Sequence, residues 1–309
     1  MLSRIAESLY WIGRLVERAE DTARLLDVHV SMLLEDVSAD EPRMCADVRN
    51  ALGVAQPPTM STTADLLEAI AYSPDGPIVG AVTAARDNAR TVREAISSEM
   101  WEALNTTRNS LPTQRARARK QGPYDFFAFV KLRAALIFGL AESTMARDDG
   151  WSFLTLGRSL ERVDMTVRTL SVAGASRDPQ LASVALLRAC GAFEAYVRTY
   201  RAMVATQQAT QFLLLDRLFP RSVFHALTRA EQALVQIVPA GAGRSGVEDP
   251  ARLALGRART RLEFAVAGTV VSDLGEHLRA VQQAVTEASA AVAERFFDQQ
   301  TVIAWSVRA

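Results

Sequence analysis

The chain has 309 residues, of which 49% are hydrophobic, so it is long and apolar enough for a sizeable core and is not of the disordered class. It carries 35 basic and 35 acidic side chains, and this balance favours neither a nucleic-acid nor a membrane partner. Almost all of the basic side chains are arginine, which reflects either genomic base composition or the recognition of anions by guanidinium groups.

The first predicted element is a long helix from Ser3 to about Glu35. Apolar residues recur in it at alternating spacings of four and three over four heptads, a pattern typical of a helix in a bundle. They are Ile5, Leu9, Ile12, Val16, Ala19, Ala23, Leu26 and Val30. A polar stretch with Pro57 and Pro58 follows, and a short helix is expected to begin after residues 61–63.

The next predicted helix follows Pro77 and ends near Asn105, with one apolar face. That face carries Ala85, Ala89, Val92, Ile96, Met100 and Ala103. We expect residues 107–123, which include Pro112, to form a loop. Residues 124–146 are expected to form a well-buried helix.

A second set of long helices is predicted after Asp148-Asp149-Gly150. They cover residues 151–173, 179–204, 208–237 with a break at Phe219-Pro220, 248–268 and 271–296. Nowhere does β-branched alternation with tight turns indicate a strand. The predicted fold class is therefore all-α, a multi-helix bundle.

An internal repeat relates the two halves of the chain. The segment GRLVERAEDTARLL, which begins at Gly13, matches GRSLERVDMTVRTL, which begins at Gly157, with seven identical residues at an offset of 144. The apolar seam is in phase, and a weaker match at an offset of 143 pairs Pro77 with Pro220 and Arg86 with Arg229. We predict one domain over residues 1–309, whose two repeats, approximately 1–144 and 145–309, pack about a pseudo-twofold axis.

A charged stripe lies opposite the apolar seam of the first helix. At 100° per residue it spans about 120°. It holds Arg14, Glu17, Arg18, Asp21 and Arg24, and the second copy holds Arg158, Glu161, Arg162 and Arg168, with Met165 in place of Asp21. The stripe is either a solvent-exposed face with weak ion pairs, a set of buried Arg–Glu pairs between the halves, or a ligand site. Its recurrence after the duplication favours the latter two.

Four segments resemble motifs of the alpha-E family, bacterial helical domains named for a Glu-Arg motif. They are LSRIAESLYWIGRLVERAEDTARLL at 2–26, ARDNARTVREAISSEMWEALN at 85–105, ESTMARDDGWSFLTLGRSLER at 142–162 and FPRSV at 219–223. The resemblance extends over most of the chain and implies a helical fold. It places Glu17-Arg18 and Glu161-Arg162, joined by Arg14 and Arg158, at the centre of the motif. It also implies association with ATP-grasp-type amide ligases and transglutaminase-like cysteine peptidases, in systems that make or modify peptides.

Two further groups are candidates for binding. On a continuous helix over 85–105, one polar face forms either a third wall of an arginine-lined site or a solvent-exposed face. Its members are Arg86, Arg90, Arg93, Ser97 and Trp101. Arg221 belongs to the second group, Phe219-Pro220-Arg221-Ser222, which indicates either a helix start with N–H groups free to hold an anion or a simple helix break.

Metal and cofactor sites are not indicated. A di-iron bundle requires Glu-x-x-His motifs, and none of His29, His225 and His277 follows a glutamate at that spacing. The two distant cysteines, Cys45 and Cys190, support neither a zinc site nor a disulfide framework, and they favour a reducing compartment. No signal-peptide pattern and no uncharged run of roughly 20 residues occurs, so we expect a cytoplasmic protein without a membrane span.

The function that the sequence favours is that of a helical accessory protein of an ATP-grasp-type ligase. It would hold or position a peptide or another carboxylate substrate through the Arg/Glu cluster. The alternative is an enzyme of peptide or amino-acid metabolism that uses Glu17 or Glu161 as an acid/base. A carboxylate among arginines has a lowered pKa and is a poor proton donor near neutral pH, which favours binding.

Overall fold

The computed structural model of the protein describes residues 2–35, 39–174, 178–238, 248–266, 268 and 270–297. These residues form helices and no strand, which confirms the predicted all-α class. The elements are α1 (Ser3–Glu35), α2 (Glu41–Leu52), α3 (Thr63–Leu66), the π-helical η1 (Leu67–Tyr72), α4 (Val79–Thr91), the 3₁₀ turn η2 (Arg93–Ala95), α5 (Ser98–Gln121), α6 (Tyr124–Thr144), α7 (Asp149–Gly174), α8 (Pro179–Ala189), α9 (Phe193–Tyr200), α10 (Thr206–Leu215), α11 (Val223–Ile237), α12 (Pro250–Glu263) and α13 (Leu274–Phe296). Among the described helices, none is long and apolar enough to cross a membrane.

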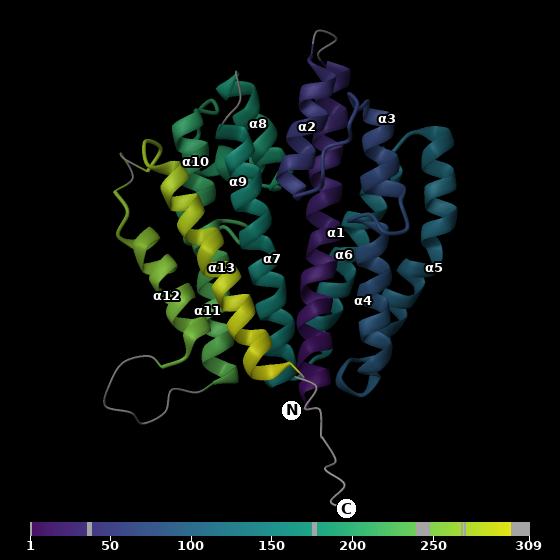
Figure 1. Ribbon diagram of the computed structural model, residues 1–309, viewed down its shortest axis with the longest axis vertical. Helices are drawn as coiled ribbons and strands as arrows, with labels where there is room; N and C mark the ends of the chain where they lie inside the picture. Colours follow the sequence, from purple (N-terminus) through teal and green to yellow (C-terminus); the bar gives the residue numbers. More distant parts are fainter. Residues whose placement is uncertain are drawn as a thin grey trace, which may run out of the picture.

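The two long helices α1 and α7 pack against each other through the middle of the molecule (Figure 1). α3, α4 and α5 lie on one side of this pair, and α10, α11 and α12 lie on the other. α1 packs against α4 and α6, which both contact α5; likewise α7 packs against α11 and α13, which both contact α12. The helices around α1 and those around α7 thus show the same pattern of contacts. The superposition of residues 10–28 on 154–172 by a roughly two-fold rotation stays a prediction.

Glycines allow the two central helices to approach closely. A Cβ atom at Gly13 would lie 2.2 Å from the carbonyl oxygen of Leu154, and one at Gly157 would lie 2.0 Å from that of Tyr10. Any side chain at either position would therefore force the helices apart. Gly13 pairs with Gly157, and Tyr10 with Leu154, at the offset of 144, so each repeat contributes the same contact.

The apolar seam of α1 is buried as its spacing predicts. Leu9, Ile12, Ala23 and Leu26 are fully buried, and Val16 and Ala19 nearly so. The N-terminal part of the seam belongs to a large core that continues into α7, α11 and α13. Ala19, Ala23 and Leu26 belong to a second core with α2, η1 and α6. α1 therefore joins both cores, and this placement fixes its charged stripe against α7.

The helix predicted from Pro77 to Asn105 is in fact interrupted. α4 ends at Thr91, Val92 has a non-helical φ of −133°, and α5 begins only at Ser98. The side chain of Ser97 starts the new helix by accepting a hydrogen bond from the backbone N–H of Met100 at 3.1 Å. The interruption means that residues 85–105 do not present one continuous helical face.

The prediction of a loop over residues 107–123 is wrong, because α5 continues to Gln121 with Pro112 inside it. A proline in a helix interior costs roughly 3 kcal/mol. Thr107, Leu111 and Ala118 are nevertheless buried on the face of α5 that packs against α4 and α6. We infer that this packing outweighs the cost of the proline.

Three smaller expectations also differ from the structure. Residues 41–52, expected in a polar stretch, form α2, which is capped by Asp40 and Gly53. Residues 179–204 form the two helices α8 and α9 and not one, with Gly191 at a φ of 60° between them. α6 buries only one face, because Leu132 and Leu136 are exposed.

Candidate functional site

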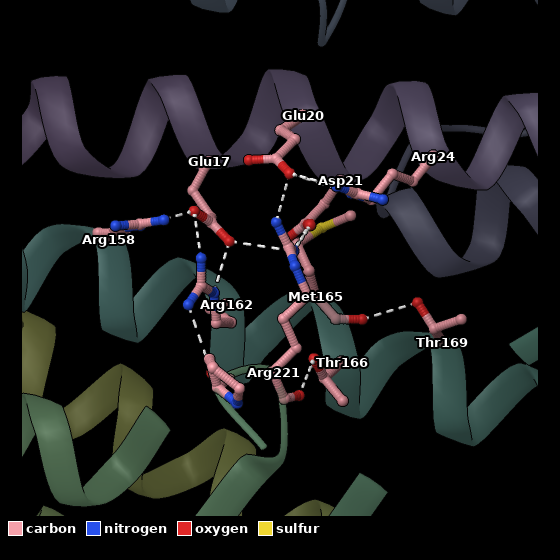
Figure 2. Close-up of polar contacts among 11 residues, drawn as sticks. Glu17, Glu20, Asp21, Arg24, Arg158, Arg162, Met165, Thr166, Thr169 and Arg221 are labelled. Carbon is pink, nitrogen blue, oxygen red and sulfur yellow. Dashed lines mark hydrogen bonds and ion pairs between the residues drawn. The ribbon is translucent and has the colours of Figure 1, made fainter. Parts of the chain in front are cut away.

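The interface between α1 and α7 holds charged side chains that are largely removed from solvent. We call them the Glu-Arg cluster, part of which is shown in Figure 2. Its members are Arg14, Glu17, Arg18, Glu20, Asp21 and Arg24 of α1, Arg158, Glu161, Arg162, Asp164 and Arg168 of α7, and Arg221 from the turn before α11. The side chains of Glu17 and Glu161 are 0% and 1% exposed. The central carboxylates are therefore not part of a solvent-exposed face.

Glu161 of α7 is held by two arginines of α1. Its Oε2 accepts a hydrogen bond from Nε of Arg14 at 2.7 Å. Its Oε1 accepts one from Nε of Arg18 at 2.5 Å, and Nη2 of Arg18 lies 3.1 Å from Oε2. Charge-assisted hydrogen bonds to a buried carboxylate are among the stronger polar contacts in proteins. These three bonds join the two halves of the chain.

Glu17 of α1 is held in the reciprocal way by two arginines of α7. Its Oε2 accepts from Nε of Arg158 at 3.1 Å, and its Oε1 accepts from Nε of Arg162 at 2.6 Å (Figure 2). The Glu-Arg pairs that match at the offset of 144 therefore exchange partners across the interface. These contacts form buried Arg–Glu pairs between the halves, one of the three alternatives that the sequence left open.

Arg24 and Arg168, which match at the offset of 144, make equivalent contacts further from the centre of the cluster. Arg24 donates to Glu20 at 2.8 Å, and Arg168 donates to Asp164 at 2.9 Å, each four residues along its own helix. Arg24 lies beside Gly191, which follows α8, and Arg168 lies beside Gly53, which ends α2. Guanidinium groups are favoured at the C-terminal ends of helices, where the helix dipole is negative.

Arg221 has no equivalent in the first half of the chain. Its Nη1 lies 3.0 Å from Oε1 of Glu17, and its Nη2 lies 2.6 Å from Oε1 of Glu20. It also donates a hydrogen bond to Asp21, which is 200 residues away in sequence (Figure 2). Three carboxylates of α1 thus converge on one guanidinium group.

The start of α11 fits the alternative of a simple helix break better than that of an anion site. α11 begins at Val223, so Pro220 lies before the helix and not in its first turn. The hydroxyl of Ser222 caps the helix by accepting from the backbone N–H of His225 at 3.1 Å. A side chain already takes the place of an anion there, and Arg221 points away to the carboxylates of α1.

The charges shift the pKa values of the cluster in opposite directions. Burial raises the pKa of Glu17, but Arg162, Arg221 and Arg158 outweigh burial, so that its pKa lies well below its usual value. Burial raises the pKa of Asp21 to about 7, because Arg221 offsets only part of an effect to which Glu17 and Glu20 add. Glu17 consequently stays ionised at neutral pH and cannot act there as a proton donor.

Arg14 and Arg158 are matched in the repeat but differ in their contacts. Besides Glu161, Arg14 donates to the hydroxyls of Tyr10 at 3.2 Å and Ser289 at 3.4 Å, and its side chain is 11% exposed. Arg158 donates only to Glu17 among the described residues, and its side chain is 34% exposed. Its two terminal nitrogens therefore have no hydrogen-bond acceptor in the described part of the chain.

The unpaired end of Arg158 opens into a cavity of about 230 Å³ between α6, α7 and α11. Its guanidinium group lies 3.7 Å from the ring centroid of Phe138, and Trp151, Arg162 and Arg229 also line the cavity. Burial and the charge of Arg162 lower the pKa of Arg158, although Glu17 acts against them. An anion in this cavity would give the two terminal nitrogens of Arg158 the acceptor that they lack.

The other predicted arginine face forms a separate group. The guanidinium groups of Arg86 and Arg93 lie 5.3 and 4.9 Å from the ring centroid of Trp101, and Arg90 is exposed. Arg86 also donates to Asn105 at 3.1 Å. Among the described residues, no hydrogen bond or ion pair joins this group to the Glu-Arg cluster. The break after Thr91 removes the continuous helix on which the predicted third wall depended, and a binding role for these residues stays a prediction.

Two members of the cluster, Glu20 and Asp164, were absent from the charged stripe that the sequence predicted. The repeat contained a signal for both, because Glu20 matches Asp164 at the same offset. Asp21 has Met165 as its counterpart, so the repeat did not single it out. Its role follows only from the approach of Arg221.

The cysteines and histidines do not form a catalytic or metal centre in the described part of the chain. No group of three or more potential metal ligands occurs there. Sγ of Cys45 lies 3.8 Å from Nε2 of His29, but burial raises the pKa of Cys45 and lowers that of His29 to about 4. Both groups are therefore neutral near pH 7, which does not favour a reactive thiolate. Burial also raises the pKa of Cys190, to about 12.

Sequence comparisons with known proteins match most of the chain. The sequence model of Alpha-E, described as a predicted alpha-helical domain with a conserved ER motif, matches residues 1–297. The uncharacterized proteins Mb2597 of Mycobacterium bovis and Rv2567 of Mycobacterium tuberculosis are each 26% identical over 284 residues, which cover 81% of this chain. The match covers 31% of each relative, so the chain spans about one third of their length. No solved structure matches the chain.

Proposed function

The chain belongs to the Alpha-E family, and on this premise we propose that it is a non-catalytic helical module that holds a carboxylate-bearing peptide for an ATP-grasp-type amide ligase. A transglutaminase-like peptidase is the second proposed partner. The proposed setting is the bacterial cytoplasm, since two buried, unpaired cysteines fit a reducing compartment. The proposal rests on the guanidinium group of Arg158. Its Nε donates to Glu17, and its two terminal nitrogens have no acceptor among the described residues.

A carboxylate is the ligand that fits the free end of Arg158 best. The guanidinium group presents parallel N–H donors that match the two oxygens of a carboxylate. Nε of Arg158 is bound to Glu17, which fixes the plane of the group, and the two terminal nitrogens remain for a ligand. A cavity of about 230 Å³ is smaller than the roughly 300–1,000 Å³ of sites for drug-sized ligands. It therefore suits an acidic side chain or a chain end and not a whole peptide.

The geometry disfavours the alternative of an enzyme that uses Glu17 or Glu161 as an acid/base. Glu17 has a lowered pKa and is completely buried. Both oxygens of Glu161 already accept hydrogen bonds from Arg14 and Arg18. Glu17 therefore has neither a proton to give near neutral pH nor a free approach for a substrate. The two glutamates therefore support the scaffold, and the arginines at its edge support binding.

Substitution of Arg158 tests the proposal against its counterpart Arg14. We expect Arg158→Gln to fold with a small loss of stability and to lose affinity for acetyl-glutamate-amide by roughly tenfold or more, since a charge-assisted hydrogen bond is removed. Calorimetry with acetyl-glutamine-amide as the uncharged probe is the control for charge. Arg14→Gln should leave this affinity within about twofold and lower the melting temperature more, because Arg14 is the better bonded of the two.

Affinity purification from the native host tests the partner. We expect an ATP-grasp-type ligase to co-purify with the wild-type chain. Equal binding of the two probes, or unchanged binding by Arg158→Gln, would contradict the proposed site. Turnover of a peptide by the purified chain alone would favour the enzyme alternative.

A further inference from the structure

The segment Pro220-Arg221 fills one side of the Glu-Arg cluster, and three kinds of contact hold it there. Nη1 of Arg162 donates to the carbonyl oxygen of Pro220 at 3.3 Å. The hydroxyl of Thr166 donates to the carbonyl oxygen of Arg221 at 3.2 Å, and the guanidinium group of Arg221 binds the carboxylates of α1 (Figure 2). We call this the closed side.

The residues that match those of the closed side at the offset of 144 lack these partners. Arg18 corresponds to Arg162, and its Nη1 has no hydrogen-bond partner among the described residues. Thr22 corresponds to Thr166; it is completely buried, and its hydroxyl has no partner. Both residues line a cavity of about 600 Å³ between α1, α2, α4 and α7. We call this the open side.

The carboxylates of the open side also have unused acceptor positions. Glu17 accepts contacts from Arg158, Arg162 and Arg221, whereas Glu161 accepts them from Arg14 and Arg18 alone. Glu20 is bound by Arg24 and Arg221, whereas Asp164 is bound by Arg168 alone. A carboxylate has about four acceptor positions. Each carboxylate of the open side thus has one arginine fewer than its counterpart.

The described part of the chain does not supply the missing arginine. At the offset of 143 that aligns Pro77 with Pro220, Arg221 corresponds to Ile78, which is completely buried in the core. Pro77 only lines the cavity. A buried hydroxyl without a partner is costly, so the hydroxyl of Thr22 indicates an acceptor from outside the described residues.

We propose that the open side binds a peptide segment with an arginine side chain, in the way that the closed side binds Pro220-Arg221. The guanidinium group of this segment lies against Glu161 and Asp164. Its backbone carbonyl accepts from the hydroxyl of Thr22, and the preceding carbonyl accepts from Nη1 of Arg18. Arginine is preferred over lysine because a planar guanidinium group reaches two carboxylates at once.

This site is distinct from the cavity at Arg158, with which it shares no lining residue. It also binds the opposite charge, so either proposal can fail without the other. Met165 takes the place of Asp21 on the open side and removes the third carboxylate. We therefore expect weaker binding than on the closed side, and a restored carboxylate should strengthen it.

The test uses acetyl-Phe-Pro-Arg-Ser-amide, which reproduces residues 219–222, and the same peptide with citrulline in place of arginine. Citrulline keeps the shape of the side chain and removes its charge. We expect the purified chain to bind the arginine peptide at least roughly tenfold more tightly than the citrulline peptide in calorimetry. Met165→Asp should tighten the binding of the arginine peptide roughly tenfold and leave that of the citrulline peptide within about twofold.

Thr22→Val and Thr166→Val form a matched pair of controls that remains informative if Met165→Asp does not fold. Thr22→Val should weaken binding of the arginine peptide roughly threefold to tenfold without lowering the melting temperature, because its hydroxyl is unpaired in the free chain. Thr166→Val should lower the melting temperature and leave binding unchanged. Equal binding of the two peptides, no binding at millimolar concentration, or preference for a peptide with glutamate in place of arginine would overturn the proposal.

Discussion

The closed and open sides of the Glu-Arg cluster carry the same repeated residues and differ in what fills the space beside them. On the closed side Arg221 reaches Glu17, Glu20 and Asp21. On the open side a cavity of about 600 Å³ lies beside Glu161 and Asp164. The reciprocal Glu–Arg pairs hold α1 and α7 together on both sides. Unmatched residues such as Arg221 decide which side is filled by the chain and which side is open to a ligand.

Removal of Arg221 should have the largest effect, because it leaves three carboxylates of the closed side without their shared cation. We expect Arg221→Met, which keeps most of the side-chain volume, to cost on the order of 3–5 kcal/mol in the free energy of unfolding. Urea denaturation of the variant measures this cost. Arg168→Met on the open side is the control and should cost less, because its side chain is 34% exposed and it has one carboxylate partner. Equal stability of the two variants would contradict the closed and open assignment.

The paired glutamates should be the next most sensitive positions. Glu17→Gln leaves Arg158 and Arg162 without a counter-charge and removes one of the three carboxylates that bind Arg221. Glu161→Gln leaves Arg14 and Arg18 without a counter-charge. Each should lower the free energy of unfolding by about 2–5 kcal/mol, with the smaller loss for Glu161→Gln because Glu161 has two arginine partners and Glu17 has three. Thermal melts should show a drop of several degrees. Wild-type melting of both variants would refute the structural role of the pairs.

Substitution of the two glycines between α1 and α7 tests whether the two repeats pack in the same way. Gly13→Ala and Gly157→Ala each place a methyl group against a backbone carbonyl, at 2.2 and 2.0 Å before relaxation. We expect each to cost about 1–3 kcal/mol, and the two costs to agree within about 1 kcal/mol. Chemical denaturation of both variants measures the agreement. A large effect at one glycine and none at the other would show that the repeats do not pack equivalently.

The smallest expected difference between the closed and open sides is in the pH dependence of stability. Asp21 has a pKa of about 7 in the folded chain against 3.8 in the reference state, so the folded chain binds the proton more tightly. Its contribution is therefore fully present below about pH 4 and is lost as the pH rises through 7. Asp21→Asn should remove this fall in melting temperature between pH 4 and pH 7. Met165→Ala is the control on the open side and should keep it.

The periodicity of the chain was sufficient to predict α1, since its apolar seam is a local property of the sequence. Its predicted bounds, Ser3 and about Glu35, match those of the structure. The interruption after Thr91 and the continuation of α5 through Pro112 were not predictable in the same way. At Pro112 the local preference is outweighed by the packing of α5 against α4 and α6, which a single sequence does not reveal.

The sequence by itself determined the all-α class and the repeated Glu-Arg pairs, because helical spacing and identity at a fixed offset are one-dimensional properties. Only the tertiary structure decided that Arg221 meets Asp21 and that the hydroxyl of Thr22 has no partner. Whether a charge or a hydroxyl is satisfied depends on distances between segments far apart in the chain. Those distances are set by how closely α1 and α7 pack, and Gly13 and Gly157 permit that approach.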